Sequence, residues 1–83
     1  GKHPDAKPWK GEGGGVLEVV ERFDGDAYRA IYTVRFEGAL YVLHAFQKKS
    51  PSWIRTDKRD QDMVRERLKR AQAHYEETKG ARS

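Results

Sequence analysis

Three stretches of alternating hydrophobic and polar residues fill the middle of the chain. They cover residues 16–23, 27–36 and 39–48, and the segments Asp24-Gly25-Asp26 and Glu37-Gly38 separate them. Alternation with a period of two is typical of antiparallel strands that have one solvated face. Asp-Gly favours tight hairpin turns because these residues tolerate a positive φ. The pattern therefore predicts a three-stranded meander with a two-residue turn at each connection.

Residues 57–78 show a different period. Apolar side chains recur there at helical spacing and form one narrow stripe, which consists of Val64, Leu68, Ala71 and Tyr75. Thr56 or Asp57 can cap the N-terminus of this helix, and Gly80 is a plausible end. Residues 1–15 contain a glycine run and two prolines, which indicates a loop or an extended arm. We therefore predict one domain over residues 1–83, of class α+β, with a small antiparallel sheet of at least three strands and a C-terminal helix.

The two-residue turns fix the predicted register of the strands. Arg29 falls opposite Phe46 and Ile31 falls opposite His44, and residues directly opposed share a face of the sheet. One face then collects mostly apolar residues: Leu17, Val19, Phe23, Tyr28, Ala30, Tyr32, Val34, Phe36, Tyr41, Leu43 and Ala45. The other, which we call the cationic face, collects Glu18, Arg22, Arg29, Thr33, Arg35, His44, Phe46 and Lys48, together with Ile31, Leu40 and Val42. We expect the helix to cover part of the apolar face, and further sequence or a partner chain to cover the rest.

Composition narrows the functional classes. The chain has 83 residues, no cysteine and a formal charge of +4 with a pI near 9.5. The absence of cysteine excludes disulfides and thiolate metal sites and fits a cytoplasmic protein. The basic balance favours nucleic acid or another polyanion as partner. No apolar run approaches a membrane span and no signal peptide is visible. Because the chain starts at Gly1 and Met63 is its only methionine, we expect native sequence upstream of it.

Arg29 and His44 are the main candidates for chemistry on the cationic face. Arg29 could hold a phosphate and stabilise developing negative charge, or it could be an ordinary cross-strand cation paired with Glu18. His44 could act as a general acid or base, or it could be a half-buried structural histidine. His3 and His74 lie outside this face, and no metal-ligand spacing is present. We therefore predict neither a metal nor a cofactor.

Phe46 and the lysine pair Lys48-Lys49 extend this candidate site. An aromatic on a polar sheet face can stack on a nucleic acid base, or it can pack against a neighbouring side chain. Register places Lys48 on the cationic face, although two lysines at a strand end often serve solubility alone. The cations of residues 55–70 are interspersed with carboxylates. A charged, solvated helix face explains them most simply, and a surface that follows a nucleic acid backbone is the alternative.

The run YRAIYTVRFEGALYVLHAFQKKS resembles the phage-derived branch of the RelE/HigB toxin superfamily of bacterial toxin–antitoxin modules. The family's YR-x-x-Y strand corresponds to Tyr28, Arg29 and Tyr32, and its L-x-x-F-x-K-K strand end corresponds to 43–49. The arm from Lys7 to Gly11 and the segment 15–18 are similar to its K-P-L-x-G and G-L-x-E motifs. The resemblance covers about residues 3–76. It implies a RelE-like fold whose N-terminal helical pair and first strand lie upstream of Gly1.

The resemblance also implies an activity. Family members cleave mRNA, usually on the ribosome, by attack of a 2′-hydroxyl on the adjacent phosphate, without a metal. Carried over to this chain, Arg29, His44 and Lys48 are the expected catalytic residues, and the expected RNA contacts come from Lys10, Arg22, Arg35, Phe46 and Lys49. The expected partners are mRNA on the ribosome and a cognate antitoxin, often a helix-turn-helix protein.

Two departures from the family pattern support an alternative. Val20 stands where many relatives have an arginine, and residues 50–53 offer no clear catalytic side chain after the basic strand end. The alternative is a non-catalytic module that binds nucleic acid or protein on the same scaffold. The first hypothesis predicts cleavage that depends on Arg29, whereas the second predicts salt-sensitive RNA binding without cleavage.

Overall fold

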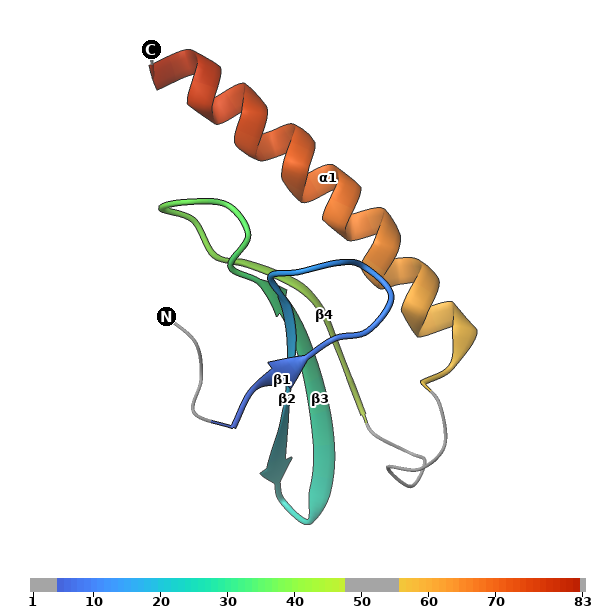
Figure 1. Ribbon diagram of the computed structural model, residues 1–83. Coiled ribbons are helices and arrows are strands. Elements are labelled where there is room, and N and C mark those ends of the chain that lie inside the picture. The colour runs from blue at the N-terminus through green and yellow to red at the C-terminus, as the bar shows by residue number, and fades with distance from the viewer. Residues whose placement is uncertain (1–4, 48–55, 83) are drawn as a thin grey trace.

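The computed structural model describes residues 5–47 and 56–82, which form a four-stranded antiparallel sheet followed by one long helix (Figure 1). The sheet order is β1-β2-β3-β4. The elements are β1 (Lys7–Pro8), β2 (Val16–Phe23), β3 (Asp26–Thr33), β4 (Tyr41–Gln47) and α1 (Lys58–Arg82). The predicted α+β class is confirmed. The described sheet has one strand more than the three that alternation indicated.

The hairpin of β2 and β3 has the predicted register. Phe23 pairs with Asp26 and Val20 pairs with Arg29. Asp24 and Gly25 have φ values of 52° and 85°, the left-handed conformation that a two-residue hairpin turn with matching twist requires at both central positions. The Asp-Gly signal in the sequence therefore predicted this turn correctly.

The connection between β3 and β4 differs from the prediction. Residues 34–40 form a longer loop in place of a two-residue turn at Glu37-Gly38. Arg29 lies opposite Phe46 and Ile31 opposite His44, as predicted, but Tyr32 pairs with Val42, which leaves Leu43 without a partner on β3. This irregularity is a β-bulge. An extra residue reverses the facing of every residue beyond it, so the predicted facing of Tyr41, Val42 and Leu43 was wrong.

Helix α1 covers the face that was predicted to be cationic and exposed. Ile31 and Val16 are fully buried on that face and belong to one core cluster with Val64 and Leu68 of α1. The bulge adds Leu43 to the same cluster. The prediction that α1 covers the other face was wrong because Val16, Ile31 and the bulged Leu43 together make the Arg29 face apolar enough to bury a helix.

The opposite face of the sheet carries a second, smaller cluster. Leu17, Val19 and Tyr32 are buried there, with Ala6 and Ala30 packed against them. On the same face Phe23 is 74% exposed and Val42 is 65% exposed. The face is therefore only partly covered by the described residues.

Residues 5–15 pack against the sheet and include β1, although the sequence indicated a loop or an extended arm. The Trp9 backbone N–H donates to Val16 O at 2.9 Å, and the Trp9 side chain lies in the main core. Glu12 forms an ion pair with Arg65 of α1 at 3.1 Å. Gly15 has a φ of 83°, and a Cβ there would lie 3.1 Å from that of Arg35, so this close approach requires glycine. The segment bridges the sheet and the helix (Figure 1).

The start and the apolar stripe of α1 follow the prediction, but its end does not. Asp57 caps the helix by accepting a hydrogen bond from the Arg59 backbone N–H at 2.7 Å. Val64, Leu68 and Ala71 are buried, and Tyr75 stacks on Phe36 with ring centroids 5.1 Å apart. The helix continues through Gly80 to Arg82. None of the described helical residues forms a segment long and apolar enough to cross a membrane.

Candidate functional site

Arg29 lies on β3 beneath the start of α1 and is 8% exposed. Its Nε is 3.1 Å from Glu18 Oε2 on β2, and its Nη1 donates to Thr56 Oγ1. The Nε–H does not point along the line to Oε2, so the contact is an ion pair without an aligned hydrogen bond. Neither atom has another hydrogen-bond partner among the described residues. This leaves a buried cation and carboxylate with unused hydrogen-bonding capacity.

His44 connects β4 to α1 through both of its ring nitrogens. Nδ1 lies 2.9 Å from Arg67 Nη1, and Nε2 lies 2.8 Å from Asp60 Oδ1. A guanidinium can only donate, so we assign Nδ1 as the acceptor and Nε2 as the protonated donor to Asp60. Arg67 also donates to Leu43 O at 3.1 Å. The predicted acid or base role of His44 stays a prediction, and it would require one of these contacts to break.

Phe46 completes the cluster. Its ring stacks on His44 with centroids 4.9 Å apart and an angle of 25° between the planes, and the Arg29 guanidinium lies 5.9 Å from the ring centroid. The structure therefore brings Arg29, His44 and Phe46 together as the register predicted. One face of Phe46 is occupied by His44, so a base could stack only on the remaining exposed part.

The other predicted residues lie apart from this cluster. Arg35 donates from Nε to Gly14 O at 3.0 Å and from Nη2 to Glu12 O, so it holds the 12–14 loop. Lys10 and Arg22 are exposed and, within the described ranges, form no ion pair or hydrogen bond with Arg29, His44 or Phe46. Lys48 and Lys49 lie outside the described residues.

Asp60 and Arg67 were not recognised from the sequence as part of the site. Asp60 was interpreted only as one of the carboxylates interspersed among the cations of residues 55–70, and Arg67 only as one of those cations. No local pattern links them to His44, because their contact depends on how α1 packs across the sheet. Thr56 was missed for the same reason. Among residues 5–47 and 56–82, no group of three or more histidine or acidic side chains is arranged to hold a metal ion.

One family model matches the chain. It is described as Phage derived protein Gp49-like (DUF891), and it matches residues 1–69. A search of curated proteins and a search of solved structures each found no match. The matched region contains the whole sheet and the N-terminal half of α1, and therefore Arg29, His44 and Phe46.

Proposed function

Because the chain belongs to the phage-derived Gp49-like family, whose members are RelE-like and toxin-like, we propose that it is the toxin of a toxin–antitoxin module. We propose further that it arrests growth by cleaving RNA without a metal. The buried Arg29 guanidinium with its unused donor capacity is the observation that carries this proposal. Such a group can bind a phosphate oxygen and stabilise the additional negative charge of the transition state.

The proposed reaction needs only the substrate's own nucleophile. The 2′-oxygen forms a bond to the adjacent phosphorus while the bond to the 5′-oxygen breaks, which gives a 2′,3′-cyclic phosphate and a 5′-hydroxyl. Arg29 would contact the phosphate. Glu18, whose carboxylate is 3.1 Å from Arg29, can accept the proton of the 2′-hydroxyl. The leaving 5′-oxygen takes up a proton, which His44, the predicted acid or base, could supply.

The test is growth on induced expression, with and without the neighbouring open reading frame. The wild-type chain should arrest growth, and the neighbour should relieve the arrest. Arg29→Ala should abolish arrest, whereas Lys69→Ala, an exposed cation elsewhere on α1, should not. Since Arg29→Ala removes the nearest cation from Glu18, the double variant Glu18→Leu/Arg29→Met, checked for soluble expression, provides a second test. Undiminished arrest by that double variant would remove both residues from the proposed mechanism.

A non-catalytic binding module is the second candidate. It is favoured by the contacts of Arg29 with Glu18 and of His44 with both Asp60 and Arg67, because these contacts occupy the groups that catalysis would need. This candidate predicts that purified protein binds RNA in a salt-sensitive manner but leaves it intact. Cleavage products ending in a 2′,3′-cyclic phosphate would contradict it.

A further inference from the structure

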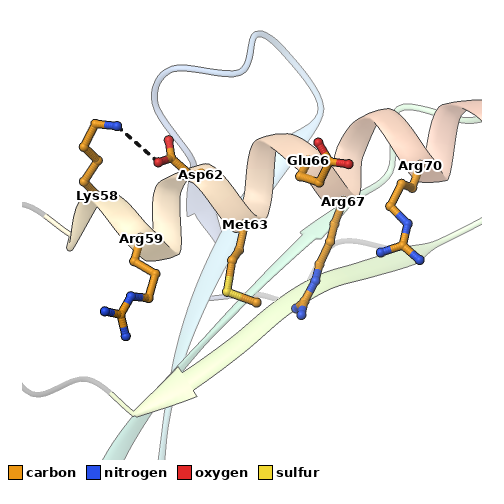
Figure 2. Close-up of a pocket in the computed structure, with 7 residues that line it drawn as sticks. All are labelled: Lys58, Arg59, Asp62, Met63, Glu66, Arg67 and Arg70. Atoms are coloured by element: carbon orange, nitrogen blue, oxygen red, sulfur yellow. Dashed lines mark hydrogen bonds and ion pairs between the residues drawn. The ribbon is translucent and has the colours of Figure 1, made fainter.

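A stripe of side chains along α1 faces the free edge of β4. Arg59, Met63, Arg67, Arg70 and His74 are spaced by four, four, three and four residues, which keeps them on one side of the helix. Figure 2 shows the side chains of Arg59, Met63, Arg67 and Arg70 extending from the same side of α1 toward the sheet. The sequence interpretation treated these cations as a solvated helix face, but they have a shared direction.

Two adjoining hollows follow this stripe. One, of about 580 Å³, is lined by α1 residues from Lys58 to Arg70. The other, of about 390 Å³, lies between α1 and β4 and includes Tyr41 and His74. Arg67 and Arg70 line both, so the hollows adjoin, and we call the two together the α1–β4 groove.

The groove carries more positive than negative charge. Its first hollow is lined by four cations and two carboxylates. One of the two carboxylates, that of Asp62, is already paired, because it lies 3.2 Å from Lys58 Nζ and 3.8 Å from Arg65 Nη1. The guanidinium groups of Arg59 and Arg70 form no ion pair or hydrogen bond with another described residue, and both side chains are exposed. Two unpaired guanidinium groups on one line favour a ligand with repeated negative charge.

The groove also offers aromatic surface. Tyr41 Oη lies 2.8 Å from His74 Nδ1, and their rings meet edge to face with centroids 5.7 Å apart. Proteins that bind single-stranded nucleic acids often place aromatic rings beside cations, so that bases stack on the rings and phosphates contact the cations. From Arg59 to His74 the helix rises about 22 Å, which is enough for several nucleotides of a single strand.

An extended acidic peptide is a poorer fit to the same groove. Such a peptide would pair with the free backbone edge of β4. The bulge at Leu43 distorts that edge, and Arg67 already occupies the Leu43 carbonyl. Bulges and covering side chains are common means of preventing strand addition.

We propose that the α1–β4 groove binds single-stranded RNA, with Arg59 and Arg70 on its phosphates and Tyr41 and His74 against a base. The choice of RNA rests on the proposed function. The groove is distinct from the Arg29 cluster, and Arg67 is common to the groove and to the contacts of His44. The groove would hold the strand while the Arg29 cluster acts on it.

The test uses the full chain and a fluorescein-labelled hexauridylate with 2′-O-methyl groups, which cannot be cleaved by 2′-hydroxyl attack. Fluorescence anisotropy is measured between 50 and 300 mM KCl. Removing two phosphate contacts should reduce the slope of log K against log salt by about 1.4, equivalent to about 25-fold weaker binding near 0.1 M. Arg59→Gln/Arg70→Gln is expected to show this loss, and Arg59→Lys/Arg70→Lys is expected to retain the slope.

The matched control is Lys69→Gln/Lys79→Gln, which removes the same charge from exposed positions outside the stripe. Equal weakening by the two glutamine pairs would overturn the proposal, because net charge alone would then explain binding. Tighter, groove-dependent binding of a labelled hexaglutamate than of RNA would overturn it in favour of an acidic peptide. Growth arrest that needs Arg29 but not Arg59 or Arg70 would reject the groove and leave the proposed function standing.

Discussion

Arg29 and Glu18 form an ion pair in a part of the sheet from which most water is excluded. Their side chains are only 10% and 13% exposed. Removing two charges from water costs several kcal/mol each, and a close pair recovers this only with good geometry and further hydrogen bonds. The off-line contact and the two unsatisfied atoms indicate that the recovery is incomplete. The pair therefore contributes little net stability, but breaking one half of it should be costly.

We expect Glu18→Gln to lower the free energy of unfolding by about 3 kcal/mol, because it leaves the Arg29 charge buried without its counterion. Glu18→Leu/Arg29→Met should return to within about 1 kcal/mol of the wild type, since apolar side chains of similar volume need no charge solvation. Urea denaturation followed by circular dichroism measures both. Glu76→Gln, an exposed carboxylate on α1, is the control and should change little. A double variant no more stable than Glu18→Gln would contradict this account.

At the scale of the elements, the bulge at Leu43 decides which residues meet the helix. It turns Leu43 toward Ile31 and α1, and it leaves Val42 on the opposite face with 65% exposure. Arg67 stabilises the bulge by donating a hydrogen bond from Nη1 to the Leu43 carbonyl oxygen at 3.1 Å. The position of α1 on this face of the sheet follows from the apolar surface that results.

Substitutions on the two faces test this arrangement. Ile31→Ala removes a side chain with no exposed area and should cost about 2–5 kcal/mol through lost burial and the cavity left behind. Val42→Ala should cost less than about 0.5 kcal/mol, since Val42 is mostly exposed. The sequence pattern had placed these two residues on the same face. Similar losses for both in chemical denaturation would mean that α1 does not pack where the structure has it.

The errors about the facing of β4 and the position of α1 share one physical origin. The Asp24-Gly25 turn, the stripe of Val64 and Leu68, and the register around Arg29 are local, and the sequence predicted them correctly. The bulge is not signalled locally, because Leu43 fits equally well on either face until the 34–40 loop sets the register. Without the bulge, the sequence pattern placed the helix on the wrong face. The burial of Arg29 and the partners of His44 were therefore not predicted either.

At the scale of the whole molecule, Trp9 connects parts of the chain that are distant in sequence. It is 7% exposed and shares one core with Val16 of β2, Ile31 of β3, Leu43 of β4 and Val64 of α1. Every described element except β1 therefore contributes to the same cluster, and β1 directly precedes Trp9. Because one core joins residues from all of these parts, the N-terminal segment, sheet and helix should unfold together.

Cooperative unfolding can be measured with Trp9 as the only tryptophan, in a Trp53→Phe background. The fluorescence of Trp9 reports the N-terminal segment, and circular dichroism at 222 nm reports mainly α1. The two urea transitions should coincide. Glu12→Gln removes the half-exposed ion pair with Arg65, which should cost at most about 1 kcal/mol and shift both transitions equally.

If Trp9 fluorescence changed at lower urea than the helical signal, the segment would be a separately unfolding unit and not part of the core. The same separation, seen only in Glu12→Gln, would mean that the contact with Arg65 is what joins the segment to the helix.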